Sequence, residues 1–75
     1  MARKSPFTNT IRRLRFDHDE MTQEDLARRI GATRQTVSAL EANRYVPSLL
    51  LAVRIARTFG VAVENVFVLG EVGDE

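Results

Sequence analysis

Hydrophobic residues in the middle of the chain recur at the three- to four-residue spacing that is typical of amphipathic helices. Residues 23–30 and 34–42 each carry such a stripe between polar and charged positions. The hydrophobic residues of the two stripes are Leu26, Ala27, Ile30, Val37 and Leu40. The pattern therefore predicts two short helices that turn these residues toward a shared core.

The residues that flank these two helices predict a tight turn between them. Thr22 and Thr33 can each cap a helix by accepting a backbone hydrogen bond, and Gly31 can adopt the left-handed conformation that ends one. Two helices that cross steeply over so short a turn leave room for only a small side chain, which Ala27 provides. The sequence thus predicts a helix-turn-helix. The outward side of its second helix carries Arg34, Gln35, Ser38 and Ala42.

A longer helix is predicted over residues 49–59, with Ser48 as its cap and Gly60 as its stop. Leu50 and Val53 lie off its inward stripe, so this helix has more apolar surface than one monomer needs. The inward stripe itself is expected to contain Leu49, Leu51, Ala52, Ile55, Ala56 and Phe59.

The ends of the chain predict shorter elements. A first helix is expected over residues 9–17, with Ile11, Leu14 and His18 at helical spacing. An extended segment precedes this helix at Phe7 and Thr8. Near the other end, a turn and a very short helix are followed by the β-prone residues Phe67, Val68 and Leu69.

The chain has 75 residues, of which 44% are hydrophobic and none is cysteine. This length and composition suit one small globular domain. Without cysteine, neither a disulfide nor a thiolate metal site can stabilise it, so helix packing and self-association remain. No apolar run reaches the roughly 18 residues of a membrane span, and we expect a cytoplasmic protein.

The formal net charge of +1 hides a segregated pattern of charges. Residues 1–15 carry five basic side chains and no acidic one, whereas residues 16–25 carry five acidic side chains and no basic one. Residues 26–57 carry six arginines against Glu41 alone. Such segregation lets a near-neutral protein present a basic face to phosphate groups.

The chain resembles the DNA-binding domains of lambda repressor and Cro, which are often called the Xre family. The residues that carry the resemblance are Gln23, Leu26-Ala27, Ile30-Gly31, Val37 and Leu40-Glu41. The run from Asn43 to Leu49, with the helix after it, resembles a compact subgroup of single-domain repressors that includes the cytolysin repressor. The resemblance implies an all-α fold, a five-helix lambda-repressor-like domain, with a small two-stranded sheet from the N- and C-terminal segments.

The domain organisation follows from these elements. Residues 7–71 are expected to form a helix-turn-helix domain that binds DNA and dimerises, and residues 72–75 an acidic tail. Residues 1–6 are expected to form a basic arm. Two interpretations of the arm stay open: Arg3 and Lys4 touch a phosphate or the minor groove, or the arm is a solvated terminus.

The second helix of the helix-turn-helix should place its first turn in the major groove of double-stranded DNA. Arg34 can pair with guanine and Gln35 with adenine, while Ser38 can reach a base or a phosphate and Ala39 a thymine methyl. Further contacts to phosphates are expected from Thr33, Thr36, Asn43, Arg44 and Tyr45. An alternative stays open for Tyr45, whose ring can equally pack on the core.

By resemblance, Gln23 contacts a phosphate and braces the first residue of the recognition helix, although it can also be an ordinary helix residue. The resemblance also pairs Arg15 with Glu41, which would lock the first helix to the recognition helix. The linker from Phe16 to Met21 is one residue longer than is usual in the family. His18 lies in this linker, but a lone imidazole between two aspartates has no known metal-ligand spacing, so no metal site is expected.

The excess of apolar residues predicts a homodimer. The expected contacts are Leu50, Val63, Val66 and Phe67, and the resemblance gives the short C-terminal helix a role in the two-fold contact. A membrane-surface role is the alternative, but basic flanks are missing there.

Together these features predict a sequence-specific DNA-binding transcriptional regulator, a repressor that binds an inverted repeat as a homodimer. An alternative is an antitoxin or another protein-interaction module of the same fold, with DNA binding secondary. No enzyme is predicted, because the serines, threonines and lone histidine form no catalytic constellation, and no cofactor is expected.

Overall fold

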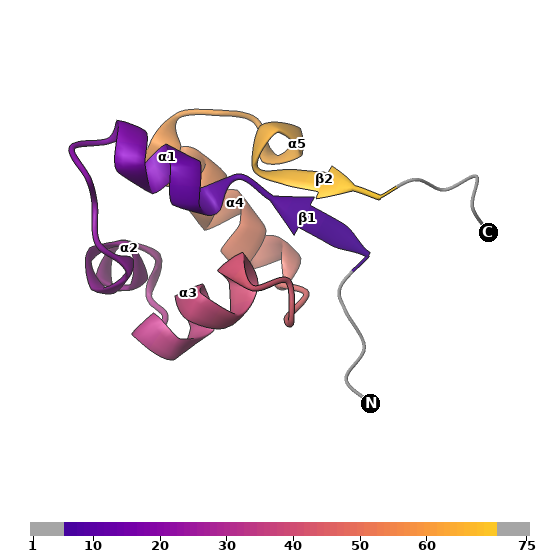
Figure 1. The fold of residues 1–75 in the computed structure, drawn as a ribbon, viewed down its shortest axis with the longest axis horizontal. Coiled ribbons are helices and arrows are strands. Elements are labelled where there is room, and N and C mark those ends of the chain that lie inside the picture. Colours follow the sequence, from indigo (N-terminus) through magenta and orange to yellow (C-terminus); the bar gives the residue numbers. More distant parts are fainter. Residues whose placement is uncertain (1–5, 71–75) are drawn as a thin grey trace.

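The computed structural model describes residues 6–70, and these form a mostly helical domain with a small sheet at one side (Figure 1). The elements in chain order are β1 (Phe7–Asn9), α1 (Ile11–Asp17), α2 (Gln23–Ile30), α3 (Arg34–Glu41), α4 (Leu49–Phe59), α5 (Val63–Val66) and β2 (Phe67–Leu69). The predicted fold of five helices with a two-stranded sheet is confirmed. The expected acidic tail and all of the basic arm except Pro6 lie outside the described residues.

The turn between α2 and α3 forms as the local residues predict. The hydroxyl of Thr22 accepts a hydrogen bond from the backbone nitrogen of Asp25, and that of Thr33 accepts one from Thr36. Gly31 ends α2 with φ 73°, a left-handed conformation that costs glycine no steric clash. The helix α2 has the predicted bounds, whereas α3 ends at Glu41, one residue earlier than predicted.

The hydrophobic core lies where α1, α2, α3 and α4 meet. Ala27 is only 4% exposed, so the small side chain does sit at the crossing of α2 and α3. The fully buried side chains that fill this core are Ile11, Leu26, Ile30, Val37, Leu40, Ile55 and Val66. One part of the predicted core was wrong: Leu49, the first residue of α4, is 78% exposed and lies outside the core cluster.

The two strands pair antiparallel, with Phe7 opposite Leu69 and Asn9 opposite Phe67. Asn9 was predicted to start the first helix, and that boundary was wrong because this residue completes the strand. The helix α1 begins two residues later. Its N-cap residue, Thr10, is tied to the far end of the chain, since its backbone nitrogen donates to the carbonyl of Val66 at 2.9 Å.

The linker between α1 and α2 accommodates its length through two residues with left-handed backbone conformations, Asp19 at φ 59° and Glu20 at φ 53°. His18 follows the last residue of α1 and is exposed, in agreement with its assignment to the linker. Its ring touches Phe59 edge-on, with the ring centroids 5.0 Å apart. None of the helices in the described part of the chain is long and apolar enough to cross a membrane.

Candidate nucleic-acid interface

The helix α3 presents two opposite sides, and only one of them is buried. Val37 and Leu40 point into the core, while Arg34, Gln35 and Ser38 are exposed. This division follows from the helical period of 3.6 residues, because Arg34 and Ser38 are four positions apart and share one face, whereas Val37 and Leu40 share another. The residues that were predicted to contact bases therefore lie on the outer surface, at the first two turns of the helix.

Two arginines near this surface are free to bind an anion. In the described part of the chain, Arg34 and Arg44 have no ion pair and no hydrogen bond from the guanidinium group, whereas Arg28 and Arg29 are both held by Asp25. A guanidinium without a carboxylate partner keeps its planar donor fork for a base edge or a phosphate. Arg12 and Arg57 are also unpaired among residues 6–70, and the sequence analysis singled out neither.

A shallow hollow runs beside the exposed side of α3. It is lined by Thr33, Gln35, Thr36, Ala39 and Tyr45. The hydroxyl groups of Thr33 and Thr36 lie 3.0 Å apart, so each hydroxyl is held in place by the other. Tyr45 is 43% exposed and lies outside the hydrophobic core cluster.

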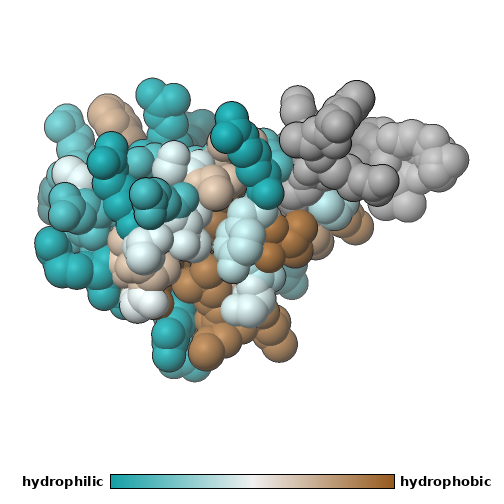
Figure 2. All heavy atoms as spheres, turned by 90° about the horizontal axis from the view of Figure 1, so that it is seen from below, coloured by the Kyte–Doolittle hydropathy of each residue, from teal (hydrophilic) through white to brown (hydrophobic). Residues whose placement is uncertain are grey.

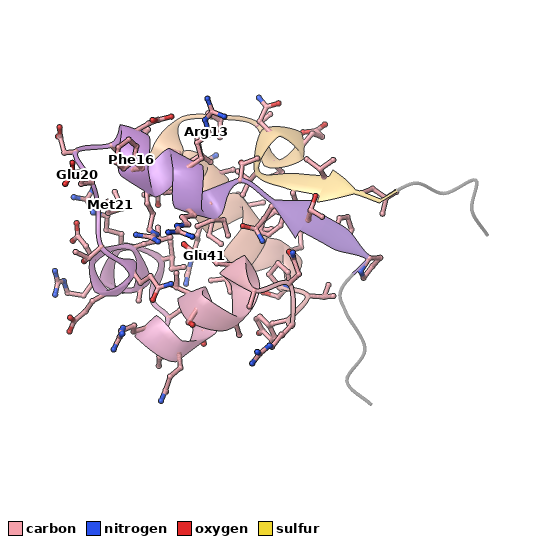
Figure 3. All side chains as sticks on the ribbon, viewed as in Figure 1. Arg13, Phe16, Glu20, Met21 and Glu41 are labelled. Carbon is pink, nitrogen blue, oxygen red and sulfur yellow. The ribbon has the colours of Figure 1, made fainter. Side chains whose placement is uncertain are left out.

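An ion pair ties α1 to the end of α3. The Nε atom of Arg15 donates to Oε2 of Glu41 at 2.6 Å, and its Nη2 donates to Oε1 at 3.1 Å. Both side chains are largely buried, at 15% and 11% exposed. A third nitrogen of Arg15 donates to the carbonyl oxygen of Met21, at the end of the linker. Figure 3 shows Glu41 between α3 and α1, and Met21 beside the linker.

Gln23 differs from its prediction. It was expected to brace the first residue of the recognition helix, but its Nε2 atom donates to Oε1 of Glu41, the last residue of α3. The first turn of α2 lies beside the pair of Arg15 and Glu41, where a buried carboxylate is a stronger acceptor than any neutral group. One N–H of the Gln23 amide is used in this bond, and the other stays available.

The loop after α3 is fixed by a residue that the sequence analysis missed. Asn43 takes a left-handed conformation at φ 60°, as its residue type allows. Asn9, from β1, donates from its side-chain nitrogen to the side-chain oxygen of Asn43 at 2.9 Å. Because these residues are 34 positions apart, no local pattern could have signalled the contact.

A second surface, which we call the apolar groove, lies where the loop after α3, the start of α4 and β2 meet. It has a volume of about 580 Å³, and its exposed apolar residues are Val46, Leu49, Val68 and Leu69. Val63 and Phe67 also line it but are half-buried, whereas Leu50 is 60% exposed and is not one of the lining residues. The prediction that Val66 is a dimer contact was wrong, because this side chain is fully buried in the core of its own monomer.

Figure 1 shows α3 at the lower edge of the domain, and Figure 2 is the view from below. In this view hydrophobic residues gather in one area right of the centre, and hydrophilic residues cover the left and upper parts.

Within residues 6–70, no three side chains of the metal-binding types gather into a group that could hold an ion.

Comparisons with known proteins agree with this geometry. A family model described as helix-turn-helix matches residues 11–65. A protein of Methanothermobacter thermautotrophicus that is named as an HTH-type transcriptional regulator is 57% identical over 54 residues, which cover 71% of this chain and 78% of that protein. One of Methanocaldococcus jannaschii with the same designation is 47% identical over 60 residues, 80% of this chain and 89% of that protein.

A solved structure shows the same fold at a lower level of identity. The crystal structure of a Bacteroides fragilis protein superposes with a TM-score of 0.69 and covers 81% of this chain and 97% of that one. Only 24% of the aligned residues are identical, so the likeness concerns the arrangement of the helices. This comparison therefore shows the fold alone.

Proposed function

The chain belongs to the helix-turn-helix family of DNA-binding regulators, and from this membership we propose that it is a homodimeric transcriptional repressor that reads a specific double-stranded DNA sequence. The observation that carries the proposal is the outer side of α3. It combines an unpaired arginine with polar side chains on a helix whose other side is locked into the core. We also propose that it is one of the small single-domain repressors of the cytolysin-repressor type.

Base reading falls to the first turns of α3. A guanidinium such as that of Arg34 donates two parallel hydrogen bonds to O6 and N7 of guanine, and an amide such as that of Gln35 matches N6 and N7 of adenine. Ser38, one turn further on, can reach a base or a phosphate. Ala39 lines the hollow beside these residues and offers its methyl group to a thymine methyl.

Phosphate contacts would hold the helix in register on both sides of the bases that it reads. On one side, the second N–H of the Gln23 amide and one hydroxyl of the Thr33–Thr36 pair can donate to phosphate oxygens. On the other side, the loop offers the side chains of Asn43, Arg44 and Tyr45. The side-chain nitrogen of Asn43 has no partner among the described residues, because its oxygen is the atom that faces Asn9.

Self-association through the apolar groove would complete the binding site. A monomer with so few base contacts selects a site weakly, whereas two copies read an inverted repeat whose halves lie about one helical turn, roughly 34 Å, apart. Leu50, Val63 and Phe67 remain the proposed contacts from the sequence, and Leu49, Val68 and Leu69 join them as exposed apolar side chains. Two copies joined there would present both recognition helices to one duplex.

Binding to the DNA upstream of the protein's own gene tests the proposal. Footprinting should reveal a protected inverted repeat, and a competition assay at moderate salt should show preference for that duplex over a random-sequence duplex. Equal affinity for both duplexes would exclude sequence-specific regulation. A dyad-symmetric footprint that overlaps the promoter supports repression, because bound protein would then exclude the polymerase.

The apolar groove also supports a second candidate, an antitoxin or another module whose main partner is a protein. An exposed apolar groove of this size can take a helix or strand of a different protein instead of a second copy. Sedimentation equilibrium separates the two candidates. A dimer at micromolar concentration favours the repressor, whereas a monomer together with a toxin-like protein encoded in the same operon favours the alternative.

A further inference from the structure

Asn9 stands where three parts of the fold meet. It is the last residue of β1 and lies opposite Phe67 in the sheet. Its side-chain oxygen accepts a hydrogen bond from the backbone nitrogen of Ile11, the first residue of α1, at 3.1 Å. Its side-chain nitrogen donates to the carbonyl oxygen of Leu40 at 2.7 Å and to the side-chain oxygen of Asn43 at 2.9 Å.

The chemistry of these partners allows only one orientation of the Asn9 amide. The backbone nitrogen of Ile11 can only donate, and the carbonyl of Leu40 can only accept. The Asn9 oxygen must therefore face α1 and its nitrogen must face α3. This orientation in turn requires Asn43 to present its oxygen to Asn9, which turns the nitrogen of Asn43 away from this contact.

The same contact secures the end of the recognition helix. The backbone nitrogen of Asn43 donates to Leu40 and that of Arg44 donates to Ala39, both at 3.0 Å, which closes the last turn of α3. This turn requires the left-handed conformation of Asn43, which costs free energy for any residue with a Cβ atom. Asn9 binds both the carbonyl of Leu40 and the side chain of Asn43, so it stabilises that conformation from outside the helix.

We propose that Asn9 is a positioning residue for DNA binding, which holds residues 43–45 in the conformation that grips phosphates. This inference rests on the proposed function, because it assigns Asn9 a role in the same interface. Asn9 itself need not touch DNA. A loop that is already ordered loses less conformational freedom on binding, so removing Asn9 should weaken the phosphate contact of Arg44 without altering which bases are read.

The first test compares Asn9→Ala with Thr10→Val on a duplex that spans the protein's own promoter. Thr10 is the matched control, since its hydroxyl also makes one long-range hydrogen bond, to the carbonyl of Asn65 at 2.7 Å, but does not touch α3 or its loop. Asn9→Ala should bind about three- to tenfold more weakly, the value of one or two side-chain hydrogen bonds. The slope of log affinity against log salt should fall by about 0.9, the contribution of one phosphate contact. Thr10→Val should bind like the wild type.

Double variants show whether Asn9 acts through the loop. If it does, adding Asn9→Ala to Arg44→Ala should cause a smaller further loss than Asn9→Ala causes alone, because the Arg44 contact that Asn9 supports is already gone. Adding Asn9→Ala to Arg34→Ala should multiply the two losses, because base reading is independent of the loop. Multiplied losses in both pairs would overturn the proposal.

A purely structural role gives a different result. Asn9→Ser keeps a hydroxyl that can accept from Ile11 but is too short to reach Leu40, so it separates the start of α1 from the loop and replaces Asn9→Ala if that variant does not fold. If Asn9→Ser lowers the melting temperature but binds with full affinity well below it, Asn9 only stabilises the fold. Salt titrations on a random-sequence duplex keep this test separate from the proposed function, because phosphate contacts form whether or not a sequence is preferred.

Discussion

Arg34 combines three properties that base recognition requires. It lies on the first turn of α3, its side chain is exposed, and no acidic group among residues 6–70 occupies its guanidinium. We expect Arg34→Ala to cost roughly 1–3 kcal/mol of binding free energy on the operator and to relax the preference at one base pair. Arg57→Ala is the control, because this arginine is also exposed and unpaired in the described structure but lies on the last turn of α4. Competition with single-base variants of the operator measures both effects.

Arg44 should behave differently because it is expected to contact a phosphate. Arg44→Ala should weaken binding to the operator and to random-sequence DNA by similar factors, and should lower the slope of log affinity against log salt by about 0.9. Salt titrations on the two duplexes measure this slope. A change of base preference in Arg44→Ala, with an unchanged slope, would assign this residue to base reading.

The sequence predicted single residues well where their neighbours along the chain decide their role. Thr22, Thr33 and Ser48 cap helices as expected, since a cap bonds to a backbone nitrogen only three residues away. Gln23 was partly misjudged, because its partner Glu41 comes from another helix and competes with every other acceptor nearby. Local chemistry therefore identifies which groups are available, while the tertiary fold decides which of them meet.

At the scale of the elements, local signals define the ends of α2, whereas a contact between distant parts of the chain defines the start of α1. The helix α2 has both of its end signals inside its own sequence, and its predicted bounds were confirmed. The start of α1 was misplaced because Asn9 belongs to a strand, and that strand exists only through its pairing with residues 67–69. A three-residue strand has too little hydrophobic alternation to show, without its partner, at which residue it ends.

The connection between α1 and α3 allows a prediction with an internal control. Arg15→Ala leaves the largely buried carboxylate of Glu41 with only the amide of Gln23 as a partner, and we expect a loss of about 3–5 kcal/mol in the free energy of unfolding. Arg13→Ala removes a pair on the same helix whose atoms are 4.0 Å apart and whose side chains are 84% and 56% exposed. Figure 3 shows Arg13 on the outer side of α1, away from Glu41.

For Arg13→Ala the expected loss in the free energy of unfolding is roughly 0–0.5 kcal/mol, because water and salt screen this exposed ion pair. Urea denaturation of both variants and the wild type measures the two losses on one scale. Equal stability of Arg15→Ala and Arg13→Ala would mean that the pair of Arg15 and Glu41 does not lock the helices together. The same result would mean that Glu41, at the end of α3, does not help to hold α3 against α1.

At the scale of the whole molecule, the sequence predicted a surplus of apolar residues but not their distribution. Val66 was counted in the surplus, yet it is fully buried in the hydrophobic core. Leu49 was counted in the core, yet it is the most exposed of the large hydrophobic residues in the described structure. Each residue lies at one end of a helix, where the periodicity of the sequence does not predict which other elements cover a side chain.

Leu49 therefore provides the test of self-association. Leu49→Gln removes an apolar side chain that is already 78% exposed in the monomer, so the fold should tolerate the change, and glutamine is a good helix former. A neutral substitution also avoids repelling DNA phosphates. In a symmetric dimer each copy loses one contact, and burial of a leucine contributes about 1.5–3 kcal/mol, so the dimer should dissociate at least roughly tenfold more readily.

Phe16→Gln is the matched control for Leu49→Gln, because Phe16 is 65% exposed but lies on α1, where Figure 3 shows it away from the groove. Sedimentation equilibrium should report a weaker dimer for Leu49→Gln alone. Binding to a full inverted repeat should weaken with it, while binding to a single half-site should stay unchanged, since each monomer keeps its recognition helix. Loss of dimerisation in the control variant alone would move the two-fold contact from the apolar groove to α1, and the two recognition helices would then be spaced by a different surface.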